Sequence, residues 1–87
     1  MHDIEIKPNL DKKLEKIFKK NRNQYEKIMK KVEEIAKHPN HYKNLRKPLQ
    51  HLKRVHIDSH FILTFSVNND SKIVILEDFQ HHDKIYI

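Results

Sequence analysis

The apolar residues of this chain change their spacing twice, and no other feature of the sequence restricts the fold as strongly. In "HDIEIK" near the start, Ile4 and Ile6 alternate with charged residues, which is the pattern of a half-buried strand. Pro8 ends that strand because proline has no amide hydrogen to give to a sheet. Apolar residues then recur every three or four positions as far as residue 38, and from residue 54 they alternate again. This order predicts a chain that mixes helices with an antiparallel sheet.

Two amphipathic helices are predicted between residues 9 and 38. The sequence "NRN" at residues 21–23 separates their apolar stripes, and Asn9 is placed to cap the first helix. The first stripe comprises Leu10, Leu14, Ile17 and Phe18, and the second comprises Tyr25, Ile28, Val32 and Ile35. Helices joined by so short a link form an antiparallel hairpin.

Three strands are predicted after the helices. Their sequences are "RVHID" (54–58), "FILTFSV" (61–67) and "KIVILEDF" (72–79), and the short polar links between them are typical of an antiparallel meander. The chain has no glycine, so we expect "NND" at residues 68–70 to supply the left-handed backbone of the second turn. A loop over residues 39–53 connects the second helix to the sheet.

These elements predict one α+β domain over residues 1–87. Its order is strand, helix, helix and three strands (β-α-α-β-β-β), with the helical hairpin packed on one face of the sheet and the other face uncovered. No apolar run approaches the roughly 18 residues of a membrane span, so we expect a cytoplasmic protein without a membrane partner. Cysteine is absent, which excludes disulfides, thiol nucleophiles and thiolate metal sites.

Positive charge narrows the class of partner. Eighteen Lys and Arg residues against twelve Asp and Glu residues give a net charge of +6. This balance favours a polyanion, namely nucleic acid, the ribosome or an acidic protein, without choosing among them.

Histidines gather on the predicted uncovered face. Strand alternation points Arg54, His56 and Asp58 away from the apolar side chains between them, and His60 in the following link is expected on the same side. Reversal of the chain near its end is expected to bring in His81, His82 and Tyr86. The side chains expected to add positive charge there are Lys47, Lys53 and Arg54.

Two chemistries suit a histidine cluster in a basic setting. In metal-free RNA cleavage, a base deprotonates the ribose 2′-hydroxyl, an acid protonates the leaving 5′-oxygen, and cations stabilise the charge on phosphorus. In a metal site, imidazoles are the ligands, but adjacent histidines rarely both reach one ion and no carboxylate has ligand-like spacing. We therefore expect no metal and no cofactor. A third interpretation is that these histidines are exposed polar residues without a function. That interpretation explains any single histidine well, but it explains the cluster less well.

The second half of the chain resembles a known toxin superfamily. The segments "LKRVHIDSHFILTFSV" and "IVILEDFQHHDKIY", together with "KPLQ" at residues 47–50, resemble the RelE/ParE superfamily and, within it, the YafQ branch of ribosome-dependent mRNA endonucleases. The resemblance implies a RelE-like fold and a type II toxin that cuts mRNA in the ribosomal A site. It also implies an acidic, helical antitoxin of the RelB or DinJ kind, which would hold the toxin inactive in a hetero-oligomer.

The resemblance further implies functional residues. In YafQ-like toxins the histidine before the hairpin and the histidine near the C-terminus are functional, and here these are His56 and His82. His60 occupies the position of a functional carboxylate, and Tyr86 is the terminal aromatic residue that stacks on a base or orients the 2′-hydroxyl. We predict that His56 and His82 transfer the protons, in an order that the sequence leaves open, with His60 as a third candidate. The neighbours ranked below them are His81 and Asp83.

Two departures from the family concern phosphate binding. RelE and YoeB relatives carry an arginine at the start of the second meander strand, where this chain has Ile62. Lys47 replaces a YafQ histidine for which nearby His51 is a substitute. We therefore assign phosphate binding to Lys47, Lys53, Arg54 and His51.

Two other functions stay open on the sequence. A ParE-like or degenerate member of the superfamily would bind a protein target or an antitoxin without cleaving RNA, although ParE relatives generally lack the C-terminal histidine and tyrosine found here. A plain basic domain would bind RNA or DNA with a steep salt dependence and without help from the histidines.

Overall fold

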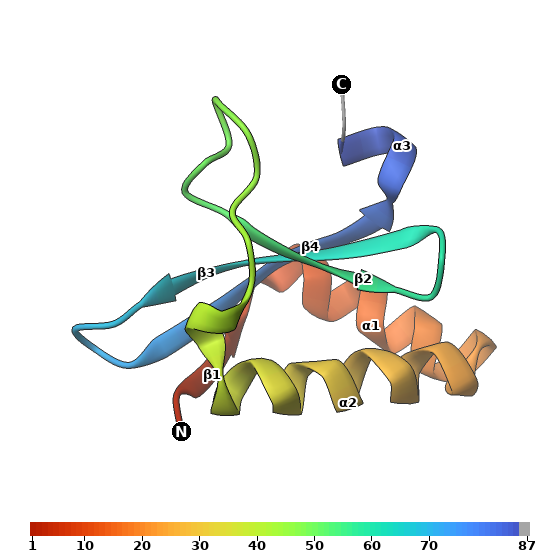
Figure 1. Cartoon of the computed structure of the whole chain (residues 1–87). Helices are drawn as coiled ribbons and strands as arrows, with labels where there is room; N and C mark the ends of the chain where they lie inside the picture. The colour runs from red at the N-terminus through yellow and green to blue at the C-terminus, as the bar shows by residue number, and fades with distance from the viewer. Residues whose placement is uncertain (86–87) are drawn as a thin grey trace.

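The computed structural model describes residues 1–85, with the backbone alone at residue 85, and it confirms the predicted order of elements (Figure 1). The strands are β1 (Asp3–Ile6), β2 (Lys53–Ile57), β3 (Phe61–Asn68) and β4 (Ile73–His81), and the long helices are α1 (Pro8–Lys20) and α2 (Arg22–Lys37). Two short helical turns are η1 (Pro39–His41) and α3 (His82–Ile85). The sequence did not predict α3, because a single turn is too short to show a helical period.

The sheet has the strand order β1-β4-β3-β2. β2, β3 and β4 form the predicted antiparallel meander, and β1 runs parallel to β4 as far as Leu76. Beyond Leu76 this edge of β4 is covered by Lys13 of α1, whose Nζ atom lies 2.7 Å from Asp78 Oδ1 and donates to the Phe79 carbonyl oxygen at 3.3 Å. A helix therefore holds the end of β4 that leads into α3.

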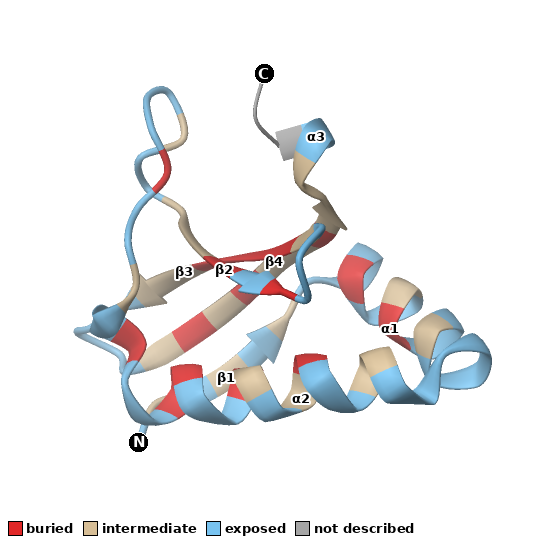
Figure 2. Ribbon diagram, turned by 45° about the vertical axis from the view of Figure 1, so that its right-hand side comes forward, coloured by how far each residue is buried: buried red, intermediate tan, exposed pale blue. Residues whose placement is uncertain are grey.

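The helical hairpin covers one face of the sheet, as Figures 1 and 2 show. The buried side chains that form this core are Leu10, Leu14, Ile28, Val32, Ile35, Val55, Ile57, Leu63, Phe65, Val74, Leu76 and Phe79. Phe65 has no exposed surface, and burying one such side chain stabilises the fold by about 1.5–3 kcal/mol. Because both layers are filled with apolar side chains, a polar site has to lie on the other face of the sheet or at its ends.

The start of the first helix differs from the prediction. α1 begins at Pro8 with Lys7 as the capping residue, and Asn9 lies inside the helix, so the predicted Asn9 cap is wrong. The ring of proline fixes a helical φ angle at the first helical position, which starts the helix two residues earlier than a cap at Asn9 would. In the break between the helices, the side chain of Asn21 caps α2 by accepting a hydrogen bond from the Gln24 amide at 3.1 Å.

Two tight turns also differ from the prediction. Left-handed backbone occurs at Asp58 and Lys72, each with φ of 57°, and not within residues 68–70. Asn68 instead accepts hydrogen bonds from the Asp70 amide at 3.0 Å and the Ser71 amide at 3.1 Å, so its side chain closes the turn.

Strand alternation predicted Asp58 on the same strand face as Arg54 and His56, and this prediction is wrong. β2 ends at Ile57, and in the turn that follows the Asp58 carboxylate reaches the Lys27 ammonium of α2 at 2.8 Å. The left-handed backbone at Asp58 breaks the alternation on which the prediction depended.

The second face of the sheet, which we call the loop-side face, is partly covered. Figure 1 shows the loop between η1 and β2 at one end of this face and α3 at the other. Leu45 is buried in this loop, which is closed by a hydrogen bond from the Leu45 amide to the Leu52 carbonyl oxygen at 2.8 Å. Ile62 and Thr64 point to this face from β3, yet only 0% and 4% of their surface is exposed, so the prediction of an uncovered face is wrong in its middle. Within the described residues, no helix is long and apolar enough to cross a bilayer.

Candidate functional site

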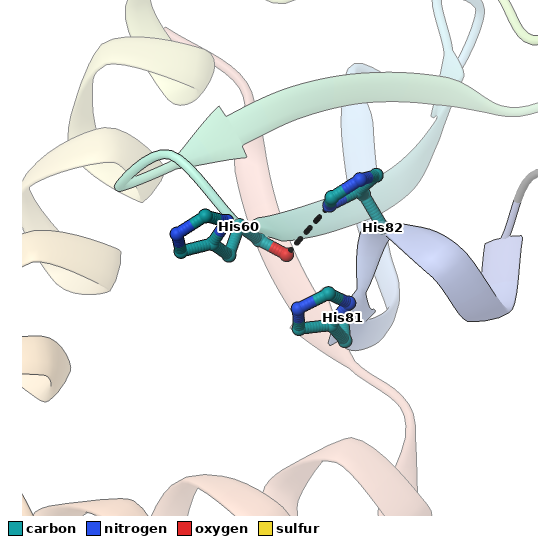
Figure 3. A group of neighbouring side chains, drawn as sticks. All are labelled: His60, His81 and His82. Carbon is teal, nitrogen blue, oxygen red and sulfur yellow. Dashed lines mark hydrogen bonds between the residues drawn. The ribbon is translucent and has the colours of Figure 1, made fainter.

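Three histidines from three elements meet at one end of the sheet (Figure 3). His60 lies in the turn between β2 and β3, His81 ends β4, and His82 begins α3. The antiparallel register pairs Phe61 with His81, so the residues just outside this pair, His60 and His82, are neighbours across the two strands. The His82 amide donates a hydrogen bond to the His60 carbonyl oxygen at 2.9 Å. We call His60, His81 and His82 the histidine trio.

The imidazole rings of the trio lie close together with nearly parallel planes. Ring centroids are 4.9 Å apart for His81 and His82, 5.9 Å for His60 and His81, and 6.3 Å for His60 and His82. One nitrogen from each ring lies within 4.8 Å of a nitrogen of both other rings. His60 is exposed and the other two are half-buried, so a ligand can reach the trio from solvent.

The ring of His82 is held from both sides. Its Nδ1 atom lies 3.2 Å from the His60 carbonyl oxygen, and its Nε2 atom lies 2.9 Å from Asp83 Oδ1. A carbonyl oxygen and an ionised carboxylate only accept hydrogen bonds. A neutral imidazole carries one N–H group, whereas the imidazolium carries two and can donate to both oxygens. Both ring nitrogens of His82 therefore face oxygens that accept hydrogen bonds.

His81 and Asp83 contribute more to the site than the sequence indicated. The sequence predicted that chain reversal brings His81 and His82 to the same region, and both rings do lie beside His60, because β4 ends at His81 and α3 begins at His82. Asp83 approaches both rings, with its Oδ2 atom 3.5 Å from His81 Nδ1. Asp83 lies in the first turn of α3, a position that acidic residues favour, and this preference was the signal in the sequence for its place.

His56 lies on the loop-side face but apart from the trio. It is exposed on β2 and pairs with Ile62 of β3, which in turn pairs with Gln80 of β4. His56 and Gln80 are thus two strand spacings apart, roughly 10 Å. The structure brings together His60 and His82 among the predicted proton-transfer residues and leaves His56 across the face from them.

The predicted phosphate-binding residues occupy two different settings. Lys47 and His51 are exposed in the loop, and Arg54 lies half-buried on β2, two residues before His56. The Lys53 ammonium donates to the Tyr42 carbonyl oxygen and to Asn44 Oδ1, both at 3.1 Å, so it also closes the base of the loop. The predicted site residue Tyr86 lies outside the described residues.

The loop that carries Lys47 and His51 is anchored by Tyr42. Its ring packs edge-on against Phe65, with the centroids 5.6 Å apart. Burial raises the pKa of the Tyr42 hydroxyl, and the Glu34 carboxylate adds to the effect. A hydrogen bond from Lys31 lowers the pKa of Glu34 in turn. These two shifts therefore belong to the scaffold under the loop and not to the trio.

The sequence matches a toxin family along almost its whole length. The sequence profile of the ParE toxin of type II toxin–antitoxin systems, parDE, matches residues 4–86. A protein of Methanosarcina mazei is 54% identical over 86 residues, which cover 99% of this chain and 100% of the relative. A protein of Methanocaldococcus jannaschii that bears the provisional name toxin RelE4 is 54% identical over 86 residues, which cover 99% of this chain and 92% of the relative.

Solved toxin structures share the fold. A chain of the intact Escherichia coli RelBE toxin–antitoxin complex superimposes with a TM-score of 0.78 at 15% identity, covering 93% of this chain and 96% of that chain. YafQ from Escherichia coli superimposes with a TM-score of 0.67 at 16% identity, covering 100% of both chains. The predicted RelE-like fold is confirmed.

Proposed function

The chain belongs to the ParE toxin family of type II toxin–antitoxin systems, within the RelE/ParE superfamily, and on this premise we propose that it cleaves mRNA on the ribosome by metal-independent acid–base chemistry. The observation that supports the proposal best is the pairing of His82 with His60 at the end of the sheet face that also carries His56. Cleavage in the A site would stop translation by destroying the message.

We assign the proton transfers to His82 and His56. His82 is the acid for the leaving 5′-oxygen, because its ring lies between two acceptor oxygens that the imidazolium alone can satisfy together. His56 is the base for the 2′-hydroxyl, because it is exposed and makes no side-chain hydrogen bond within residues 1–85. Two strand spacings separate His56 from Gln80, which lies two residues before His82. This separation leaves room for a phosphodiester, with acid and base on opposite sides of the phosphorus. His60 contributes chiefly the carbonyl oxygen that positions His82.

Positive charge on this side of the molecule holds the phosphates. Arg54 is the residue nearest in sequence to His56 on the same strand face, and a guanidinium pairs with phosphate through two parallel hydrogen bonds. Lys47 and His51 add charge from the loop, and Lys53 retains one donor beyond the two that close the loop. We assign the stacking of a base, or the orientation of the 2′-hydroxyl, to Tyr86.

An antitoxin is the second proposed partner, beside the ribosome and its mRNA. The fold is shared with a chain of the RelBE toxin–antitoxin complex, and a chain of net charge +6 suits an acidic, helical antitoxin. The two would form a hetero-oligomer in which the toxin is inactive.

A ParE-like activity is the alternative, and the profile that matches this chain carries the ParE name. In that case the protein would bind a protein target without cleaving RNA, and the trio would have no catalytic part. The two functions differ in whether transcripts are cut in cells that produce the protein.

Primer extension on mRNA from cells that express the full chain tests the proposal. We expect cuts at codon-related positions for the wild type and for the control His38→Ala, whose side chain is exposed outside the site. We expect none for His56→Ala or His82→Ala. Intact transcripts with the wild type would favour the ParE-like alternative, and full cleavage by both variants would show that the site lies elsewhere. Co-purification with the antitoxin would verify that each variant folds.

A further inference from the structure

We propose that His60, His81 and His82 also form a binding site for one divalent transition-metal ion of the zinc type, and that the bound ion switches off RNA cleavage by occupying His82. The binding site stands on the geometry of the trio alone, whereas the switch rests on the proposed function.

The three ligand nitrogens are nearly close enough to share an ion. They lie within 4.8 Å of one another. Nitrogens at tetrahedral positions around Zn²⁺ are about 3.3 Å apart, because each Zn–N bond is about 2.0–2.1 Å long. Side-chain rotation has to close a gap of up to about 1.5 Å. It also has to turn the nearly parallel rings, so that the lone pairs in their planes point to one ion. His81 and His82 come from the junction of β4 and α3, and His60 comes from the turn between β2 and β3, so three backbone positions would supply the ligands (Figure 3).

Asp83 supplies the carboxylate that such a site needs. Metal-bound imidazoles commonly donate their second N–H group to a carboxylate, which fixes the ring and strengthens the ligand. Asp83 Oδ1 lies 2.9 Å from His82 Nε2, which leaves His82 Nδ1 to bind the ion. The same carboxylate offsets part of the positive charge of an ion bound to three neutral rings.

Three imidazoles select the class of metal. Imidazole nitrogens suit Zn²⁺, Cu²⁺ and Ni²⁺, whereas Mg²⁺ and Ca²⁺ require oxygen ligands. With three protein ligands, the fourth position of a tetrahedral ion is left for water or another small ligand.

The ion and the RNA chemistry compete for one atom. A metal bound to His82 Nδ1 uses the lone pair of this nitrogen and so replaces the hydrogen that would otherwise point to the His60 carbonyl oxygen. A metal-bound His82 cannot protonate the leaving oxygen, so the loaded protein is inactive as a nuclease.

Zinc titration of the full chain, stripped of metals, tests the binding site without any reference to activity. We expect calorimetry to show one Zn²⁺ ion per chain, with affinity lowered at least about tenfold in His81→Ala and in Asp83→Asn. The control His38→Ala removes a histidine outside the trio and should bind Zn²⁺ with the affinity of the wild type. Co²⁺ in place of Zn²⁺ should give the visible absorption of a tetrahedral site in the wild type and lose it in His81→Ala. The absence of one-to-one binding, or unchanged affinity in a folded His81→Ala variant, would overturn the site.

Cleavage assays with and without Zn²⁺ then test the switch. The ring of His81 lies against His82, so the inhibition of each protein is compared with its own metal-free rate. We expect zinc that inhibits the wild type to leave the rate of His81→Ala unchanged. Equal inhibition of both would disprove the switch even if zinc binds. If no condition gives cleavage, the proposed function and the switch both fail, and the binding site is still decided by the titration.

Discussion

The His60 carbonyl oxygen accepts a hydrogen bond from the His82 amide at 2.9 Å and lies 3.2 Å from Nδ1 of the same residue. His82 is thus held by hydrogen bonds to the backbone of His60, whose ring centroid lies 6.3 Å from that of His82. This relationship separates two histidines that the sequence treated as alternatives for one role.

Removing the ring of His60 should therefore cost far less RNA cleavage than removing the ring of His82. We expect His82→Ala to lose about 10²- to 10⁴-fold in rate, the usual contribution of a general acid. His60→Ala keeps the carbonyl oxygen and should lose less than about tenfold. Initial rates of cleavage on programmed ribosomes measure both. An equal loss in the two variants would mean that the His60 ring itself takes part in the chemistry.

Long periodic segments of this fold were predictable, and the junctions between them were not. The alternation in β2 and β3 and the stripes on α1 and α2 extend over several turns or residue pairs, so one unusual residue does not hide them. At Pro8, the fixed φ angle of proline started a helix where the polar pattern placed a cap at Asn9. At Asp58, a left-handed residue ended a strand that alternation would have continued.

The candidate site lies at such junctions, which is why only part of it could be predicted. Strand alternation separates His81 from His82, and only the change from β4 to α3 between them brings both rings to His60. A single helical turn is too short to show a helical period in the sequence. Its formation depends on contacts with β3 and β4. The resemblance to YafQ-like toxins pointed to His56 and His82, with His60 at the position of a carboxylate, and His81 was ranked below them. The structure places His81 with His60 and His82, and His56 apart from them.

The ion pair between Lys13 and Asp78 should stabilise the end of β4. Replacing Lys13 by Met keeps most of the apolar stem and removes the charge that covers this strand edge. We expect the free energy of unfolding to fall by about 1 kcal/mol, a modest value because Lys13 is 42% exposed. Urea unfolding measures this, with Lys12→Met as the matched control because Lys12 is exposed on the same helix. Equal losses in both variants would show that the pair contributes nothing specific.

The raised pKa of Tyr42 should make the fold sensitive to alkali. Burial favours the neutral hydroxyl, so the stabilisation by Tyr42 is complete below its unfolded pKa of 10.0 and is lost as the pH rises through the higher folded value. Tyr42→Phe keeps the packing against Phe65 and removes the ionisable group. We expect the wild type to lose more unfolding free energy than Tyr42→Phe between about pH 8 and about pH 11. Parallel pH dependences in urea unfolding would show that the hydroxyl remains in contact with water.

Salt dependence separates a charge-based contact from a site built on the histidines. Lys47 is exposed on the loop, and if it neutralises one phosphate, Lys47→Ala should weaken RNA binding at every sequence and reduce the salt slope by about 0.7 to 1. Filter binding with an RNA methylated on its 2′-hydroxyls measures binding without cleavage. Lys12→Ala, on a helix that covers the other face of the sheet, removes the same charge and should leave the slope unchanged. If both lysines change the slope equally, the protein binds RNA only through its net charge, which is the behaviour expected of a plain basic domain.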